Sequence, residues 1–314
     1  MWVINNRKVF YMVSSVLVVA SFLSLIFWGL KPGIDFTGGT LIEVAYPNGR
    51  PDQATIASSL AVLDPTASIR PSGSNEYIVR MKPVDQNEKA IVLSALSANE
   101  SSASTSVATS TVTSAAAGVL KTFDSIGPIL GAEALRKAYV SIILVIIGIV
   151  LFITFAFRKV SEPVSSWKYG LTAIIALVHD VIIPTGVFSV LGHFAGYEVD
   201  TLFVTALLVI LGFSVHDTIV VFDRVRENLR LSSAKRPFGE VVGVSISQTF
   251  TRSINTSMTT LIALVVLYIL GGSTTEHFSL ALIVGIAVGT YSSIFIGSPL
   301  LVTIEKWGSK NKTE

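Results

Sequence analysis

Long apolar runs separated by shorter polar segments occupy most of the chain. A bilayer core ~30 Å thick takes about 20 helical residues to cross. Six runs are long enough to cross, and they cover residues 9–30, 138–157, 169–191, 201–222, 253–270 and 278–304. The pattern therefore predicts six transmembrane helices.

The first apolar run has some features of a signal peptide, because it follows Arg7 and Lys8. It is long, however, and it leads into Lys31, Pro32 and Gly33 without the small-residue pattern of a cleavage site. We therefore expect residues 1–30 to form a short N-terminal segment and a retained membrane anchor.

A long polar segment between the first two runs resembles a soluble domain. Residues 40–46 and 76–81 alternate between apolar and polar positions, as half-buried strands do. Residues 51–63 and 88–96 space their apolar positions like helices. We expect a small α+β domain in which helices cover one face of a sheet.

The end of this segment is poor in large apolar residues, since residues 97–117 are mostly Ser, Ala and Thr. Such a stretch buries little surface. We expect a mobile link or a weakly packed helix there.

Composition supports a membrane protein, with 51% apolar and 14% charged residues. The net charge of +2 is too small to indicate a nucleic-acid partner. Cysteine is absent, which excludes disulfides, thiolate metal sites and cysteine nucleophiles.

The distribution of Lys and Arg predicts the orientation. The short loops 192–200 and 271–277 contain neither residue, whereas the other short loops and both chain ends are basic. Basic short loops lie on the cytoplasmic side. We therefore expect cytoplasmic termini, an external domain at 31–137, five further spans within 138–304 and a cytoplasmic tail at 305–314.

Asp217 and Arg252 are the first candidates for chemistry. Both are placed near the cytoplasmic ends of neighbouring antiparallel spans, and ionisable groups in a bilayer are costly enough to suggest a function. The polar residues Gln248, Arg252, Asn255 and Thr259 share one helical face. Three interpretations remain: a static pair between helices, a neutral Asp217 hydrogen-bonded to the backbone, or a proton relay in which Arg252 controls proton binding by Asp217. We favour the relay.

Two His-Asp neighbours, His179-Asp180 and His216-Asp217, stand within the spans. Adjacent helical residues point about 100° apart, so we expect no hydrogen-bonded dyad in either pair. Their spacing matches no ligand motif, and we expect no metal site. Asp180 lies near mid-span before Pro184, where a break in helical bonding admits water. Both a relay member and a polar contact between helices fit Asp180.

Small residues recur every four positions in the last span, at Gly285, Gly289 and Ser293. This spacing allows close helix approach. We expect these residues to pack helices within the chain.

Five ordered motifs resemble the SecF members of the SecD/SecF protein-export family over nearly the whole chain. They are KPGIDFTGGT (31–40), SIGPILGAE (125–133), GFSVHDTIVVFDRVREN (212–228), TRSINTSMTTLIAL (251–264) and VGTYSSIFIGSPLL (288–301). The resemblance implies a bundle like that of RND transporters with an external ferredoxin-like domain, in the bacterial inner membrane.

The resemblance also implies partners and roles. The partners would be SecD, the SecYEG channel and the translocating polypeptide, with the proton motive force as energy source. The family's intramembrane acid and its basic partner fall on Asp217 and Arg252, and its post-anchor motif contains Asp35, Gly38 and Gly39. The glycines would permit a tight turn. His216 stands where the family more often has Asn, which suggests an additional proton carrier.

Three other functions are compatible with parts of the pattern. A proton-coupled RND exporter half would share the spans, and a passive translocon scaffold would share the family motifs. An intramembrane aspartyl protease would need a GxGD motif, but Ser-Val-His precedes Asp217. We therefore expect a transport protein with no enzymatic activity and no cofactor.

Overall fold

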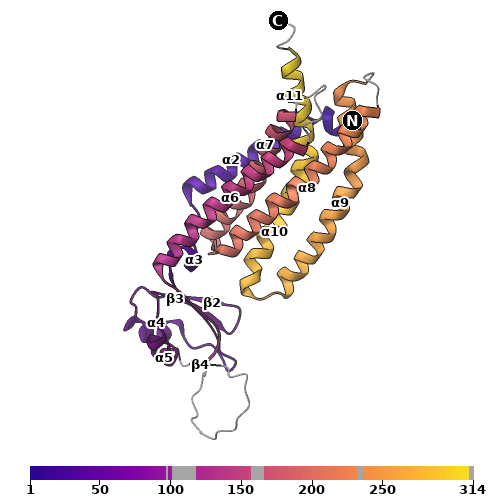
Figure 1. Cartoon of the computed structure of the whole chain (residues 1–314). Helices are drawn as coiled ribbons and strands as arrows, with labels where there is room; N and C mark the ends of the chain where they lie inside the picture. Colours follow the sequence, from indigo (N-terminus) through magenta and orange to yellow (C-terminus); the bar gives the residue numbers. More distant parts are fainter. Residues whose placement is uncertain (97, 101–117, 157–165, 232–235, 311–314) are drawn as a thin grey trace. The chain divides into compact units, whose positions relative to one another are not determined.

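The computed structural model describes residues 1–96, 98–100, 118–156, 166–231 and 236–310. The chain divides into two compact units, one made of Met1–Lys31 and Ala138–Glu314 and the other of Pro32–Lys137 (Figure 1).

Six helical segments are long and apolar enough to cross a membrane. A short helix α1 (Trp2–Asn5) precedes the first of them. The spans are α2 (Arg7–Phe27), α6 (Pro128–Ala156), α7 (Ser166–Phe194), α8 (Thr201–Leu231), α9 (Phe238–Leu270) and α10 (Ser273–Ser292), the last continuing through the π-helical turn η1 (Ser293–Gly297) into α11 (Ser298–Lys310). The six long apolar helices predicted from the apolar runs are confirmed.

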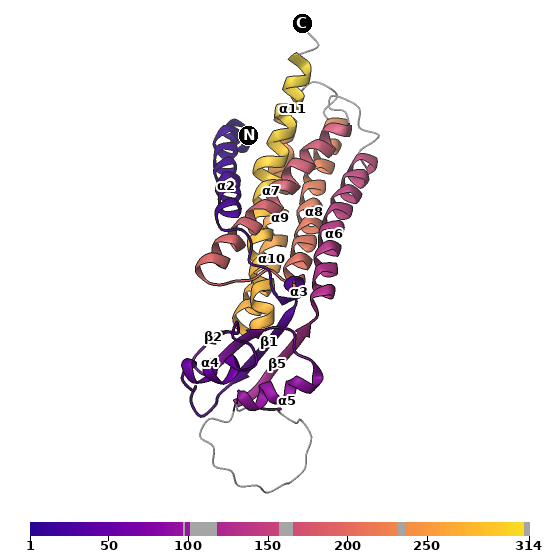
Figure 2. The ribbon, with the colours of Figure 1, turned by 90° about the vertical axis from the view of Figure 1, so that its left-hand side faces the viewer.

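Burial differs strongly among the spans. In the most apolar part of each, half of the residues of α7 and of α8 are buried, against 6% in α6 and 17% in both α2 and α9. Figure 2 shows α7, α8 and α10 running together along the bundle. These helices therefore form the interior, and α2, α6 and α9 present broad apolar faces to lipid or to another protein.

Close helix approaches occur at glycines. A Cβ on Gly186 of α7 would lie 2.6 Å from the Ser21 Cα of α2. A Cβ on Gly285 of α10 would lie 2.1 Å from the Ile210 Cδ1 of α8, and one on Gly289 would lie 3.2 Å from the Ser214 Cβ. The small-residue stripe of the last span thus lies against α8.

The second unit contains a five-stranded sheet of order β2-β3-β1-β5-β4. Its strands are β1 (Gly39–Ala45), β2 (Ser68–Ser72), β3 (Glu76–Met81), β4 (Ala98–Glu100) and β5 (Gly118–Ile126). All neighbours pair antiparallel except β4 and β5, which are parallel.

Two helices, α4 (Gln53–Ala61) and α5 (Gln86–Ala95), cover one face of this sheet. Ile42 and Val44 of β1 pair in register with Val79 and Tyr77 of β3, and all four side chains are buried. The helices begin where the sequence provides caps, since Asp52 and Asp85 accept bonds from first-turn N–H groups.

The sequence pattern identified β1, β3, α4 and α5, but not β2 or β5. β2 contains Pro71 and has a single buried residue, Ile69, so no period-two pattern marks it. Within the stretch 97–117, Ala98–Glu100 forms a strand and not the link or helix expected, because β5 offers it a partner edge. Residues 97 and 101–117 lie outside the described residues.

The post-anchor motif and the motif at 125–133 meet within this unit. The short helix α3 (Ile34–Thr37) ends at Gly38 and Gly39, which have φ values of 73° and 132°. A Cβ on Gly38 would lie 2.8 Å from the Pro128 Cα, and one on Gly131 would lie 2.9 Å from the Gly38 N. Asp35 lies in α3, half-buried.

Candidate functional site

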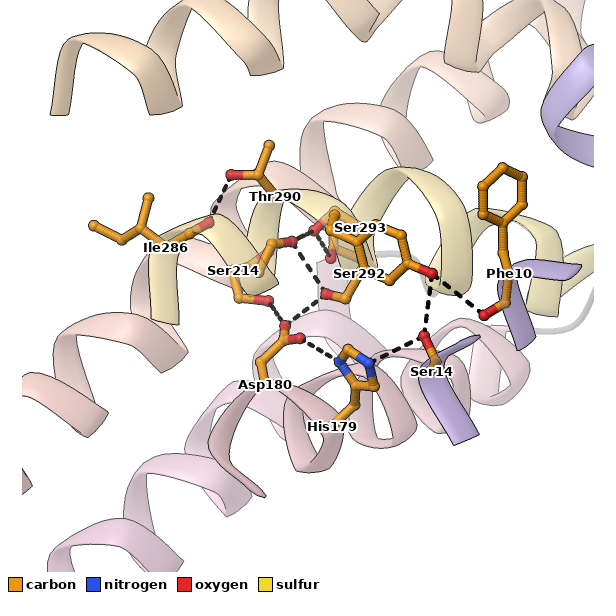
Figure 3. A network of polar contacts seen from close by, with 12 residues as sticks. Phe10, Ser14, His179, Asp180, Ser214, Ile286, Thr290, Ser292 and Ser293 are labelled. Carbon is orange, nitrogen blue, oxygen red and sulfur yellow. Dashed lines mark hydrogen bonds and ion pairs between the residues drawn. The ribbon is translucent and has the colours of Figure 1, made fainter. Parts of the chain in front are cut away.

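Asp180 is the centre of a buried polar network inside the bundle (Figure 3). Its side chain is completely buried in α7. Asp180 Oδ2 accepts hydrogen bonds from Ser214 Oγ of α8 and from Ser292 Oγ of α10, the latter at 2.7 Å. Hydroxyl groups from two neighbouring helices thus replace the water that the carboxyl group loses on burial.

His179 contacts the other carboxylate oxygen, with its Nδ1 2.8 Å from Asp180 Oδ1. The expectation of no hydrogen bond between these neighbours is therefore wrong. The two side chains leave the helix in different directions, but Nδ1 is the ring nitrogen nearer the backbone, and side-chain rotation brings it to the short aspartate.

The network continues from His179 to α2. His179 Nε2 lies 3.2 Å from Ser14 Oγ, and Ser14 Oγ lies 3.4 Å from the Tyr291 hydroxyl. Tyr291 donates in turn to the Phe10 carbonyl at 3.3 Å. These contacts connect α2, α7 and α10 around one imidazole ring.

On the opposite side, hydroxyls lead from Asp180 toward Asp217. Ser293 Oγ lies 3.3 Å from the Ser214 carbonyl oxygen and 2.9 Å from Thr218 Oγ1. Thr218 is the residue next to Asp217 on α8. A series of polar groups therefore extends from Asp180 to the immediate neighbour of the second buried acid.

Two irregularities of the backbone lie at this network. Pro184, inside α7, has no N–H to donate to the carbonyl of Asp180 four residues earlier. The π-helical turn η1 begins at Ser293, and Ser298 Oγ donates to the Ser293 carbonyl at 2.9 Å. π-Helical turns often occur at functional sites because they redirect side chains and free backbone groups.

Asp217 is also buried, at 3% exposure, but has fewer partners. Ser253 of α9 faces the carboxylate, yet Asp217 Oδ2 and Ser253 Oγ make no hydrogen bond within the part of the chain that the structure describes. A buried carboxylate oxygen without a donor is costly when ionised, so it is a place where a proton can be held.

The other predicted relay residues lie on the outside of the bundle. Arg252 and His216 are exposed. No ion pair joins Asp217 to Arg252 among the described residues. Asn255 and Thr259 are exposed beside Arg252, whereas Gln248 accepts from Arg224 Nε at 2.7 Å.

The loop between α7 and α8 contacts the segment that follows α2. Lys31 Nζ lies 3.3 Å from Glu198 Oε1, and Val199 N donates to the Lys31 carbonyl at 2.9 Å. Tyr197 donates to Glu276 Oε1 at 2.8 Å, and burial together with this hydrogen bond raises the pKa of Tyr197. The two acid-bearing helices therefore share a loop that is fastened to the end of the first span.

Reasoning from the sequence missed Ser14, Ser214, Ser292 and Tyr291. A signal was present in the first span, where Ser14, Ser21 and Ser24 recur on one helical face of an otherwise apolar segment, and all three are buried. The described residues contain no group of three or more His, Asp or Glu side chains placed to hold a metal.

The chain is similar to a known family of membrane proteins. Residues 106–307 match the family described as protein export membrane protein SecD/SecF, C-terminal, and residues 24–46 match the SecD/SecF GG motif. The protein translocase subunit SecF of Thermobaculum terrenum is 39% identical over 310 residues, or 96% of this chain and 93% of its own length.

A longer relative and a solved structure are also similar. The protein translocase subunit SecDF of Thermus thermophilus is 33% identical, covering 100% of this chain and 40% of its own length. A crystal structure of SecDF, described as a translocon-associated membrane protein from the same organism, aligns with a TM-score of 0.77 at 30% identity, over 96% of this chain and 38% of that chain. This chain thus spans less than half of SecDF.

Proposed function

Because the chain belongs to the SecD/SecF family of protein export membrane proteins, we propose that it is a SecF-type translocase subunit driven by the proton motive force. It works with SecD, beside the SecYEG channel, in late steps of translocation of an unfolded polypeptide. Its place is the bacterial inner membrane, which its apolar spans cross six times, with both termini in the cytoplasm.

The buried Asp217 carboxyl carries this proposal. A carboxyl group inside a membrane span costs several kcal/mol, and Asp217 Oδ2 has no hydrogen-bond partner among the described residues to offset that cost. A static ion pair with Arg252 would have given this oxygen a hydrogen-bond donor. Asp217 therefore binds and releases the proton, with Arg252 and His216 acting on it electrostatically and Asp180 as a second relay member.

The energy is sufficient for a conformational change. One elementary charge crossing 100 mV releases ~2.3 kcal/mol, which biases a two-state equilibrium by more than tenfold. The α7–α8 loop offers a route for coupling, since it joins the helices of Asp180 and Asp217 and is bonded to Lys31, the residue before the external unit. Protonation thus drives a swing of the external domain that hinders backsliding of the polypeptide.

The exposed stripe on α9 supports a partner in the membrane. Arg252, Asn255 and Thr259 are costly to expose to lipid, so another protein covers them. The long relative is named SecDF, and this chain matches 40% of it. We assign SecD as the protein that covers this stripe.

The external unit is of the ferredoxin-like kind and the bundle of the RND kind. In support, β1, α4, β2, β3, α5 and β5 occur in the βαββαβ order of that fold, with the short strand β4 added before β5, and β3, β1 and β5 are neighbours in the sheet.

The test is proton-driven protein export in membrane vesicles that contain the chain and SecD. Asp217→Asn and Arg252→Met are compared with the wild type after equal folding and complex formation are established. Both variants are expected to lose the export that depends on the proton motive force, whereas ATP-driven initiation continues.

Asp223→Asn is the matched control, because Asp223 is an exposed acid on the same helix that pairs with Arg226 at 2.6 Å. It is expected to export normally. Normal proton-driven export by Asp217→Asn would instead make the chain a passive scaffold, and proton-linked transport of small molecules without export would indicate an RND-like exporter half.

A further inference from the structure

We propose that His179 exchanges protons between the buried Asp180 carboxyl group and a hydrated cavity between α2 and α7. This inference rests on the proposed proton-driven function and adds to it a second exchange site with its own access from the flank of the bundle.

A cavity of about 340 Å³ lies beside His179. Its walls come from α2, α7, η1 and α11, and most of them are apolar. The polar members are Tyr11, Ser14, Ser15 and His179. A space of this size, lined in part by hydroxyls and a ring nitrogen, has room and partners for water.

The imidazole ring stands between this cavity and the acid. His179 Nε2 is directed to Ser14, a cavity-lining residue, at 3.2 Å, and Nδ1 is directed to Asp180 at 2.8 Å (Figure 3). A proton accepted at Nε2 and a proton released from Nδ1 to Asp180 leave a neutral ring in its other tautomer. The positive charge of the proton is thus transferred to Asp180, and the imidazole ring is charged only during the transfer. Imidazole is the side chain best suited to this exchange near neutral pH.

The groups facing His179 come from three helices. Asp180 is its neighbour on α7, and Tyr291 of α10 lies against the ring with a centroid distance of 6.4 Å. Tyr11 of α2 lies in the cavity wall, its hydroxyl 3.1 Å from Thr303 Oγ1 and within electrostatic reach of Arg7. Asp180 is the acid among these groups, so it is the acceptor for a proton that His179 releases from Nδ1.

Polar contacts continue from Asp180 toward Asp217. Ser214 and Ser292 contact the same carboxylate oxygen, and Ser293 connects the Ser214 carbonyl to Thr218, beside Asp217. The Ser214 carbonyl only accepts hydrogen bonds, so this series transmits a change in side-chain orientation and not the proton itself. The two buried acids are therefore parts of one polar system, and His179 is its link to the flank.

The first experiment tests the water in the cavity. The chain has no cysteine, so single cysteines report without background. Ser15→Cys places a thiol in the cavity wall, and Val16→Cys places one at the same depth on α2 outside it, at a position that is 63% exposed. A water-soluble maleimide, applied to membranes that contain the SecD complex, is expected to label Ser15→Cys at least about tenfold faster than Val16→Cys. Equal, slow labelling would mean that lipid fills the cavity and would overturn the proposal.

The second experiment tests the ring itself. His179→Ala is expected to lower the proton-driven export rate by about a hundredfold, the lower range for a positioned proton-transfer group. Free imidazole in the medium is expected to restore part of the rate, with a pH profile that follows the titration of the added imidazole. His193→Ala, at the exposed end of the same helix beside Trp28, is the control that keeps the wild-type rate and ignores imidazole.

The outcomes separate this inference from the proposed function. If Asp217→Asn abolishes proton-driven export but His179→Ala retains the wild-type rate, the function holds and the His179 route is wrong. If His179→Ala loses activity without any rescue by imidazole or change in pH profile, His179 is structural and the proposal is likewise overturned. If Asp217→Asn exports normally, the proposed function is wrong, and the His179 route, which rests on it, is wrong as well.

Discussion

Asp64 and Asp180 are both buried, but they differ in the kind of hydrogen-bond donor that contacts the carboxylate. Asp64, in the external unit, accepts from Thr66 Oγ1 at 2.6 Å and from the backbone N–H groups of Thr66 and Lys82 at 2.9 Å and 2.7 Å. Backbone N–H groups cannot rotate away from the carboxylate, and they cannot accept a hydrogen bond. Asp180 has hydroxyl and imidazole partners, which can do both. We therefore assign Asp64 a structural role and Asp180 an exchanging one.

Asp64 makes the stability of the external unit depend on pH. The Thr66 hydroxyl, with the N–H groups of Lys82 and Thr66, lowers the pKa of Asp64 despite its burial. A folded-state pKa below the unfolded value of about 4 means that the stabilisation is complete above pH 4 and is lost as the pH falls through the folded value. Asp64→Ala is expected to destabilise the unit by about 1–3 kcal/mol at neutral pH.

Amide hydrogen exchange in β3 of the intact protein measures this, since opening free energies appear there as exchange rates. The difference between Asp64→Ala and the wild type should shrink on acidification. Asp124→Ala, on an exposed position of β5, is the control and should change the exchange little. A constant difference at all pH values would contradict the assignment.

At the scale of elements, α2 depends on a glycine for its place in the bundle. Ser24 Oγ donates to the Gly186 carbonyl at 3.1 Å, and Ser189 Oγ donates to the Ser24 carbonyl at 2.9 Å. These side chain to backbone bonds form because the two helices approach closely at Gly186. The approach also forms the His179–Ser14 contact further along the same pair of helices.

Gly186→Ala is expected to push α2 away from α7 and to destabilise the bundle by about 1–3 kcal/mol, as overpacking does. The obstacle is the backbone of Ser21, which cannot rotate aside. The thermal unfolding midpoint in detergent measures the effect. Gly148→Ala is the matched control, because a Cβ there meets nothing within 4 Å, and alanine favours a helix over glycine. An unchanged midpoint for Gly186→Ala would show that the helices are not held together here.

At the scale of the whole molecule, the N-terminus and the last helix, α11, meet at the same end of the bundle. Met1 lies against Gly243 near the start of α9, and Tyr11 of α2 bonds to Thr303 of α11 at 3.1 Å. An even number of spans requires this arrangement. The absence of Lys and Arg from loops 192–200 and 271–277 predicts which side each end faces.

Single cysteines test this orientation in intact cells. Gly272→Cys, at an exposed position with open space around it, is expected to react with a membrane-impermeant maleimide added outside. Leu231→Cys, which is 72% exposed at the end of α8, is expected to react only after the membrane is permeabilised. The reverse pattern would place the termini and the basic loops outside.

The sequence by itself determined the spans, much of the external unit and the candidate acids. Hydrocarbon leaves a spanning segment no source of backbone hydrogen bonds except its own helix, so six apolar runs become six helices. The cost of a charge in lipid likewise singles out Asp180 and Asp217 without coordinates. The period-two pattern identified β1 and β3 for an equally local reason.

The tertiary structure decided what those acids contact. Ser14, Asp180, Ser214 and Ser292 come from four helices, and no spacing in the chain relates them, because helix packing alone sets which faces meet. The His179–Asp180 bond depended on side-chain torsions that neighbouring helices restrict. The outward position of Arg252 followed from the packing of α9, and β2 and β5 became strands because β3 and β1 offered them edges.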